Sequence, residues 1–287
     1  MWQGWKPRPV PSFRTPSGAH SPRRPQVRTR LSVVLIVRDE AERIDDCLRE
    51  LSWADEVVVL DTGSSDGTPD RVGPLATHLS RIDHWPGFGK ARQLAETNAT
   101  GEWILMVDAD ERLSPALRDD IQRVVGLDTR NAVYACRVQS WCFGRRIRFG
   151  GWSSFWVTRL YPRGIARWND ALVHERLVVP EGAKRVRLRG HLSNYTYRTR
   201  EECQATLARY AEDWANEHRD HLGRRRSVPG PTARASWTFF RSYVLRLGFL
   251  DGRVGWTLAL ALAGYTREKY MLLRQEPDSQ AAGRSGR

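Results

Sequence analysis

Residues 103–111, WILMVDADE, place an apolar run directly before three carboxylates, and they constrain the fold more than any other segment. A short apolar run bounded by turn residues is typical of a buried strand, so the acids are expected where that strand leaves its sheet. Two carboxylates about 4 Å apart repel by roughly 4 kcal/mol at an effective dielectric of 20. A cation is therefore expected between Asp108 and Asp110, and oxygen ligands favour Mg²⁺ or Mn²⁺. A solvated acidic turn would share this pattern. If the site binds Mg²⁺, however, the ion usually shares its coordination with substrate phosphates, so a nucleotide diphosphate is the expected partner.

The preceding sequence repeats the alternation of strand and helix. LSVVLIV (31–37) and EVVVLD (56–61) are β-branched runs that end in acids, and residues 78–82 are a candidate third strand. Helices are expected over 38–51, within the turn-rich segment 62–72 and over 88–101. This order predicts an α/β fold with a mostly parallel sheet flanked by helices. Ligands of such sheets bind outside the carboxyl ends of the strands. The acids that would gather at this edge are Asp39, Glu40, Asp61, Asp66, Asp108 and Asp110.

Phosphate-binding glycine motifs are missing from the sequence of these loops. No glycine triplet follows the first expected strand, and the Walker-type loop is absent. A bound metal is therefore expected to hold the phosphates, with help from Lys90 and Arg92. Those two residues begin the third expected helix, whose N-terminal amides would add to the attraction.

The combination of these segments, rather than any one of them, resembles a known enzyme family. LSVVLIVRDEAERIDDCL, WADEVVVLDTGSSDGT, WPGFGKAR (85–92) and GEWILMVDADE together are similar to the nucleotide-binding half of a family-2 glycosyltransferase with the GT-A (Rossmann-like) fold. GGWSSFWVTRLYPRG (150–164), ALVHE (171–175) and GHLSNYTY (190–197) resemble the branch of lipopolysaccharide-core β-glucosyltransferases. The resemblance covers about residues 31–270. Asp39 departs from it, because the family usually has asparagine there and an ionised aspartate only accepts hydrogen bonds.

The resemblance implies a metal-dependent, inverting transfer of a hexose from a nucleotide-diphosphate sugar, most simply a UDP-sugar. Asp61 and Glu40 would contact the base and Asp108 the ribose. Asp110 would bind the metal ion that bridges the two phosphates, and His191 would complete the coordination, as a histidine does in some GT-A enzymes. The metal would offset the charge that develops on the departing diphosphate.

The acceptor side is expected to be basic. An inverting transfer needs a base within hydrogen-bond reach of the acceptor hydroxyl. The resemblance implies Glu175 for that role, with Asp170 second, although an ion pair of Glu175 with an arginine is an alternative. Residues 140–200 carry 13 Lys/Arg and three Asp/Glu, whereas residues 31–139 carry 12 and 20. This polarity favours an anionic glycan or glycolipid acceptor, such as a lipopolysaccharide core or another cell-envelope glycan, with Trp152, Arg145 and Arg146 as candidate contacts.

Composition divides the chain into four expected parts. Residues 1–30 form a basic, proline-rich tail expected to be disordered, and residues 275–287 a second loose tail. Residues 31–199 form the catalytic domain, with a nucleotide-sugar half (31–130) and an acceptor half (131–199). Strands are expected over 131–143 and 155–161. Residues 200–274 form a helical extension, with a helix over 203–223 and two more interrupted at Asp251 and Gly252.

The chain is expected to be cytoplasmic. Four cysteines form no close pair, no signal-peptide pattern is present, and the apolar stretch 256–265 is about half the roughly 20 residues that span a bilayer. The apolar residues of the extension fit packing against the catalytic domain. They also fit peripheral contact with the inner face of the cell membrane through Phe239, Phe240 and Trp256 with flanking arginines.

The sequence leaves two other classes of function open. A nucleotidyltransferase uses a similar sheet and acidic metal site, but it would be expected to carry a basic, glycine-rich loop where residues 38–41 read RDEA. A non-enzymatic, basic protein that binds a surface or nucleic acid would account for the positive charge and the tryptophans, but it gives the carboxylate cluster no role. The sequence therefore disfavours nucleic acid as a partner.

Overall fold

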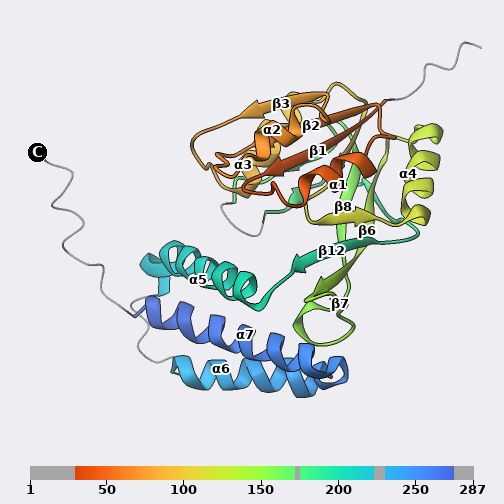
Figure 1. Ribbon diagram of the computed structural model, residues 1–287. Coiled ribbons are helices and arrows are strands. Elements are labelled where there is room, and N and C mark those ends of the chain that lie inside the picture. Colours follow the sequence, from red (N-terminus) through yellow and green to blue (C-terminus); the bar gives the residue numbers. More distant parts are fainter. Residues whose placement is uncertain (1–29, 172–174, 223–229, 275–287) are drawn as a thin grey trace, which may run out of the picture.

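The computed structural model describes residues 30–171, 175–222 and 230–274, and it has the expected α/β architecture. Figure 1 shows the sheet and its flanking helices as one layered body, with the three long C-terminal helices below it. The expected tails, 1–29 and 275–287, lie outside the described residues, as does part of the ALVHE segment (172–174).

The N-terminal half of the sheet is parallel, as predicted. β1 (Leu31–Val37) pairs with β2 (Glu56–Asp61) on one side and with β4 (Trp103–Met106) on the other. β2 pairs in turn with β3 (His78–Arg81), so the candidate third strand is confirmed. All four carboxyl ends therefore meet at one edge of the sheet.

The second half of the sheet is mixed, with both parallel and antiparallel pairs. β8 (Phe155–Pro162) runs antiparallel to β4 and to β6 (Ala132–Cys142), which confirms the two strands expected over 131–143 and 155–161. β12 (Leu192–Tyr197) lies parallel to β6 and carries the short β5 (Glu111–Leu113) at its outer side. Two short strands, β7 (Arg145–Arg146) and β11 (Lys184–Arg187), also pair with β6 outside this order. β6, β11 and β12 therefore run in the same direction as β1 to β4, whereas β8, β7 and β5 run in the opposite direction. A separate two-stranded sheet is formed by β9 (Arg167–Trp168) and β10 (Leu177–Val178).

Alternate residues of the parallel strands pack into two cores, one on each face of the sheet. Val33 and Leu35 of β1 face the core under α1 (Ile44–Glu50), α2 (Thr68–Val72) and α4 (Pro115–Leu127). Val34 faces the core under α3 (Phe88–Thr97). A strand covered on both faces reads as a continuous apolar run rather than an alternating one, which explains the sequence of β1 and β2.

Two helices are shorter than predicted. The helix expected over 38–51 begins only at Ile44, because residues 38–43 form a loop that is hydrogen-bonded to the loop after β2. The helix expected over 88–101 ends at Thr97, and the turn that follows brings the Thr100 amide to the Glu56 carboxylate. In both cases a tertiary contact outweighs local helix propensity.

The C-terminal residues form the expected helical extension, α5 to α7. α5 (Arg200–Leu222) starts three residues earlier than predicted, and α6 (Pro231–Phe240) precedes α7 (Gly252–Leu272). The break between α6 and α7 is longer than the predicted pair of residues, since it contains a π-helical turn, η2 (Arg241–Leu245), and a 3-10 turn, η3 (Gly248–Asp251). A third apolar cluster joins α5 and α7 to the β6–β7 hairpin and to the short turn η1 (Gly150–Trp152).

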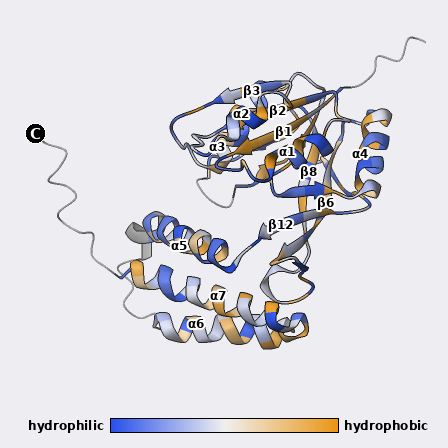
Figure 2. Cartoon of the chain, viewed as in Figure 1, coloured by the Kyte–Doolittle hydropathy of each residue, from blue (hydrophilic) through white to orange (hydrophobic). Residues whose placement is uncertain are grey.

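The hydropathy of the residues differs between the sheet and the C-terminal helices. Figure 2 shows hydrophobic colour along β1 and β2, and a mixture of hydrophobic and hydrophilic residues along α6 and α7. Among the described residues, no helix has both the length and the apolar character required to cross a bilayer.

Candidate active site

The loops after β1 and β2 hold each other at the carboxyl edge of the sheet. The Asp39 amide donates to Ser64 Oγ (2.9 Å), and the Ser65 amide donates to Asp39 Oδ1 (2.8 Å). Asp39 adopts a left-handed backbone conformation, φ 54°, which aspartate and asparagine tolerate better than most residues. Its carboxylate accepts hydrogen bonds from Ser65. Aspartate therefore fits this position by accepting hydrogen bonds from the loop after β2, where the family usually has asparagine.

The two residues expected to contact the base are Glu40, which lies in the β1–α1 loop, and Asp61, which ends β2. Asp61 is fully buried, both its oxygens accept from the Ser64 amide at 3.3 Å, and Arg81 Nε lies 3.5 Å away. Glu40 pairs with Arg43 at 2.8 Å, and its pKa is raised chiefly by burial, although Arg43 opposes this.

A groove of about 660 Å³ opens at this place between the β1–α1 loop and the start of α5. Its walls are mostly charged. They are formed by Asp39, Glu40, Ala41, Glu42, Arg43, Asp66, Arg198, Thr199 and Glu202.

Asp108 lies between two buried arginines. Its carboxylate accepts from Arg92 Nη2 (2.9 Å) and from Arg159 Nη2 (2.6 Å), and Arg159 also donates to Glu111 (2.7 Å). Burial alone would raise the pKa of Asp108, but Arg159 and Arg92 outweigh it and hold that pKa well below its usual value. Asp108 is therefore an ionised acceptor whose position is fixed from two sides.

Asp110 differs from Asp108 in having no such partner. Within the described residues its side chain makes neither a hydrogen bond nor an ion pair, while its carbonyl oxygen accepts from the Tyr195 amide (2.8 Å). Burial, with the nearby Asp108 and Glu40 carboxylates, raises the pKa of Asp110 to about 7. A divalent cation would relieve this crowding.

The protein's own donors do not form a complete metal cage. No group of three or more His, Cys, Asp or Glu side chains in the described residues is arranged to hold an ion. One free carboxylate beside a second one nevertheless fits Mg²⁺ or Mn²⁺ that shares its coordination with substrate phosphates. The residues present thus fit the expected metal in its substrate-bound form.

Arg92 connects this carboxylate pair to the expected base. Its Nε donates to Glu175 Oε1 at 3.0 Å, so the ion pair considered as an alternative for Glu175 is present. Arg92 also lies over the Trp168 ring, 5.0 Å from its centroid. Its remaining nitrogen, Nη1, is buried and has no hydrogen-bond partner in the described part of the chain. An unpaired buried donor is costly, so this nitrogen is suited to an anionic ligand.

A glycine allows the chain after β9 to pack closely on α3. The Gly89 amide donates to the Ala171 carbonyl oxygen (3.1 Å), so residues 169–171 lie beside the first turn of α3. A Cβ at Gly89 would lie 1.8 Å from the Asn169 carbonyl oxygen, so any larger residue would push this segment away. Gly89 of the WPGFGKAR segment therefore allows residues 169–171 to lie against the first turn of α3, the helix that carries Arg92.

The other predicted site residues lie further out. Asp170 accepts from Gln93 at the surface (2.9 Å), and Lys90 is exposed on the first turn of α3. Trp152 packs edge-on against Tyr197, and Arg145 and Arg146 are exposed on β7.

The structure does not bring His191 to Asp110. Ser114 exchanges hydrogen bonds with the His191 backbone, whereas Asp110 is bonded to the Tyr195 backbone. The two positions are therefore about 13 Å apart along the β5–β12 ladder. Burial and two arginines, Arg146 and Arg137, lower the pKa of His191.

Several residues of the site have no clear signal in the sequence. Arg159 is a single arginine within an apolar strand, and that contrast is the one signal that could have singled it out. Arg43 pairs with Glu202 of α5 at 2.6 Å, across 159 residues of sequence. Burial raises the pKa of Tyr210 on α5; Arg209 opposes this, and the Asp110, Asp108 and Glu175 carboxylates add to the rise.

Comparison with known proteins identifies relatives over most of the chain. An uncharacterized glycosyltransferase of Rickettsia bellii is 25% identical over 82% of this chain and 82% of its own length. The lipopolysaccharide core biosynthesis glycosyltransferase LpsC of Rhizobium meliloti is 28% identical over 53% of this chain and 58% of its own. A TPR repeat-containing protein of Synechococcus elongatus is 45% identical over 29% of this chain, which spans 21% of that longer protein.

Among solved structures, glucosyl-3-phosphoglycerate synthase from Mycobacterium tuberculosis in complex with Mg²⁺ and uridine diphosphate matches 40% of this chain and 44% of its own. Its sequence identity is 24% and the TM-score is 0.31. The family model for glycosyl transferase family 2 matches residues 32–175, which is half of the chain and includes every carboxylate of the site from Glu40 to Glu175. The chain belongs to glycosyl transferase family 2.

Proposed function

We propose that the protein is a metal-dependent, inverting glycosyltransferase that moves a hexose from a nucleotide-diphosphate sugar, a UDP-sugar, to an anionic glycan or glycolipid. The observation that carries the proposal is the chain Glu175–Arg92–Asp108–Arg159, which ends beside the unpartnered Asp110 at the carboxyl edge of the sheet. Family membership gives glycosyl transfer as the reaction, in place of nucleotidyl transfer or simple surface binding. The uridine nucleotide comes from the resemblance of the sequence segments.

The donor would lie along this edge with its nucleoside toward the groove of the β1–α1 loop. Glu40 and the Asp61 region would face the base, and Asp108, held ionised by its two arginines, would accept from the ribose hydroxyls. Asp110 would hold a Mg²⁺ or Mn²⁺ ion together with the donor phosphates. When bound, that ion supplies Lewis-acid stabilisation of the departing diphosphate. Arg92 Nη1 is a free donor for a phosphate oxygen at the same place, with Lys90 nearby on the same helix.

Glu175 would accept the proton of the acceptor hydroxyl. That oxygen then forms the new bond to the anomeric carbon as the bond from this carbon to the diphosphate oxygen breaks. Arg92 Nε, which donates to one oxygen of Glu175, orients the carboxylate and leaves its other oxygen available. Asp170 is the second candidate for this role, but it lies at the surface and accepts from Gln93.

The acceptor would approach over the basic residues 140–200. Arg145, Arg146 and Trp152 are its candidate contacts, and a lipopolysaccharide core or another cell-envelope glycan is the proposed acceptor class. The similarity to LpsC supports this choice. A cytoplasmic location at the inner face of the membrane and contact with that membrane are part of the same proposal.

A nucleotide screen followed by a transfer assay tests the proposal. UDP, GDP, CDP and ADP are compared by thermal shift with and without Mn²⁺, and UDP is expected to give the largest metal-dependent stabilisation. Transfer from UDP-hexoses to phosphorylated glycans is then measured for the wild type and for Asp110→Asn. The variant is expected to lose metal-supported turnover with its fold intact, because an amide is a poorer ligand for a hard cation.

The matched control is Asp119→Asn, the same change at an exposed acid on α4. Its turnover should equal that of the wild type. If Asp110→Asn keeps more than about a tenth of the wild-type rate at saturating Mn²⁺, the metal role is refuted, since a Lewis-acid metal contributes several kcal/mol and each 1.36 kcal/mol is tenfold.

A further inference from the structure

The turn between α6 and α7 presents large apolar side chains to solvent. Within residues 240–250, the side chains of Phe240, Val244, Leu245, Leu247, Phe249 and Leu250 are between 40% and 54% exposed. We call these six residues the apolar tip. Trp237 and Trp256 extend it on the flanking helices with 56% and 46% exposure. Monomeric proteins rarely expose contiguous apolar surface of this kind unless it contacts a partner or a membrane.

The tip is held in place by a closely packed backbone. Gly255 of α7 approaches Gly248 so closely that a Cβ there would lie 1.9 Å from the Gly248 carbonyl oxygen. Leu247 has a left-handed backbone conformation, φ 58°, which is unusual for a bulky residue. Asp251 accepts from the Arg148 and Phe149 amides and joins the turn to the segment after β7. The surrounding structure therefore fixes a conformation in which leucine side chains point outward.

Arginines surround the apolar tip, and the nearby Asp251 carboxylate already accepts two backbone hydrogen bonds. Arg241, Arg246 and Arg253 are exposed, and Asp251 is the one carboxylate between residues 231 and 257. Arg246 and Arg148 line a cleft of about 610 Å³ with Ser153, Ser154 and the backbone of Gly150 and Gly151. In the described part of the chain, neither guanidinium forms an ion pair. Two free guanidiniums beside hydroxyl groups are suited to a phosphate.

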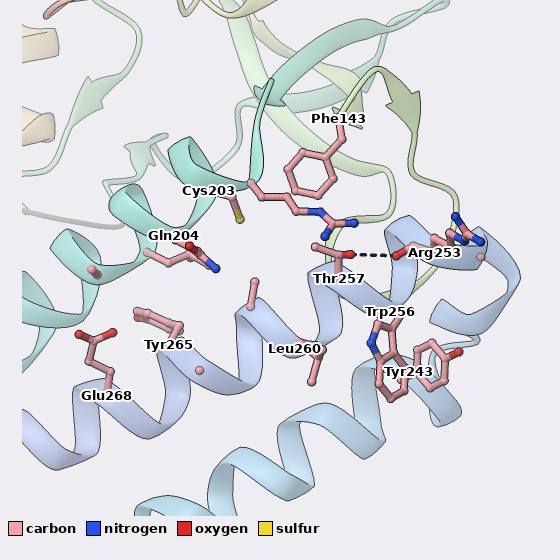
Figure 3. Close-up of a pocket in the computed structure, with 16 residues that line it drawn as sticks. Phe143, Cys203, Gln204, Tyr243, Arg253, Trp256, Thr257, Leu260, Tyr265 and Glu268 are labelled. Carbon is pink, nitrogen blue, oxygen red and sulfur yellow. Dashed lines mark hydrogen bonds between the residues drawn. The ribbon is translucent and has the colours of Figure 1, made fainter.

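Further apolar surface adjoins the tip between α5 and α7. A groove of about 760 Å³ runs between these helices, and Figure 3 shows Trp256 and Tyr243 at one end of it, with Leu260 projecting from α7. Trp256 packs edge-on against Phe239 and Tyr243 at 5.1 Å from each ring. The tryptophan is thus fixed with almost half of its surface exposed, beside an apolar groove.

We propose that this surface docks the protein on an anionic phospholipid bilayer. The apolar tip enters the boundary between headgroups and acyl chains, and the cleft of Arg148 and Arg246 takes a lipid phosphate. A bilayer fits better than a second copy of the chain, because a two-fold contact through the tip would place these arginines against their own counterparts. The inference rests on the proposed function in one respect: an acceptor that belongs to the cell envelope gives the protein a reason to contact the membrane.

Vesicle sedimentation of the full-length protein, without nucleotide, tests the inference. We expect binding to vesicles of phosphatidylcholine mixed with phosphatidylglycerol, weak binding to phosphatidylcholine alone, and a decrease with salt because the charges are at the surface. The double variant Leu245→Ser with Leu250→Ser should bind the mixed vesicles at least roughly tenfold more weakly, since each leucine buries several CH₂ and CH₃ groups. Arg148→Glu with Arg246→Glu should remove the preference for the anionic lipid.

Matched controls lie on α4. Leu127→Ser removes a leucine that is 64% exposed, and Arg118→Glu reverses an exposed arginine, so both should bind vesicles like the wild type. Thermal unfolding checks the fold of every variant, and the single variant Leu250→Ser replaces the double variant if the latter does not fold.

Three results would overturn the inference. The first is unchanged vesicle binding by the tip variants. The second is binding that disappears when residues 1–29 are deleted but persists in the tip variants. The third is a concentration-dependent dimer that the tip variants abolish, without vesicle binding by the wild type. Because no donor or acceptor is present, a failure to detect sugar transfer would count against the proposed function and leave this result unaffected.

Discussion

Replacing the proposed base, Glu175→Gln, separates catalysis from structure more sharply than any other change at this site. Glutamine keeps the size of the side chain and an oxygen that accepts from Arg92 Nε, which lies 3.0 Å from Glu175 in the wild type. It loses the ability to take a proton. A positioned general base contributes about 10²–10⁴-fold, so kcat should fall at least roughly 100-fold, equivalent to about 2.7 kcal/mol.

Donor binding should survive this substitution. Arg92 still pairs with Asp108 through Nη2 at 2.9 Å, so its charge is not left alone in the interior. Exchanging a charge-assisted hydrogen bond for a neutral one should lower the free energy of unfolding by about 1 kcal/mol, and the protein should remain folded. The nucleotide dissociation constant, measured by calorimetry with Mn²⁺, should stay within about threefold, or less than 1 kcal/mol, of the wild type.

The assay compares kcat, acceptor KM and nucleotide affinity for three variants. Glu181→Gln makes the same change at an exposed position after β10 and should match the wild type. If nucleotide affinity falls in parallel with the rate, Glu175 is structural. If Asp170→Asn is the slow variant instead, the base lies at Asp170.

Three further perturbations test other parts of the reasoning. Arg145→Glu with Arg146→Glu should raise the acceptor KM and reduce its salt dependence, because surface charges act mainly on the encounter with the acceptor. The donor KM should hardly change. Equal use of a neutral acceptor by the wild type and the variant, at low and at high salt, would contradict this. Burial raises the pKa of Glu96 to about 7 from 4.5, so its ionised form destabilises the fold increasingly as pH rises through that interval. Glu96→Gln should therefore stabilise the protein at pH 8 by up to about 3 kcal/mol and much less at pH 4, as measured by urea unfolding, and an equal effect at both values would refute it. Arg159→Met should cost about 3–5 kcal/mol of stability, because it leaves Asp108 and the buried Glu111 without their shared partner; a loss under about 1 kcal/mol would show that these carboxylates are not dependent on it.

The parallel half of the fold was predictable because its signals are local. The apolar runs of β1, β2 and β4 each end in acids, and the order of strands and helices limits the topology to a parallel sheet. The same reasoning placed Asp108 and Asp110 together at one edge. The strand ends of a parallel sheet converge whatever the details of packing, so the position of these acids needed no tertiary information.

The remaining parts of the site depend on pairings that no local pattern encodes. β5 is three residues long and exists because β12, about 80 residues later, lies beside it. Arg159 lies in a strand that the sequence assigns to the acceptor half, yet its guanidinium donates to Asp108 and Glu111 of the nucleotide half. The His191 prediction came from analogy with related enzymes. The register of β12 against β5 decides its position, and it brings Tyr195 to Asp110 in place of His191.

The contact between the β1–α1 loop and α5 would make donor binding and docking on a bilayer thermodynamically dependent on each other if either ligand favoured one position of α5. Arg43 joins Glu40 to Glu202, and Arg198 pairs with Glu42, so one short loop of the nucleotide edge is bonded to the first turn of α5. α5 in turn packs on α7, which carries the surface beyond the apolar tip. A ligand that favours one position of α5 at either end therefore changes the free energy of binding at the other. Such coupling is reciprocal by necessity: the factor by which vesicles change the dissociation constant of the donor must equal the factor by which the donor changes the affinity for vesicles.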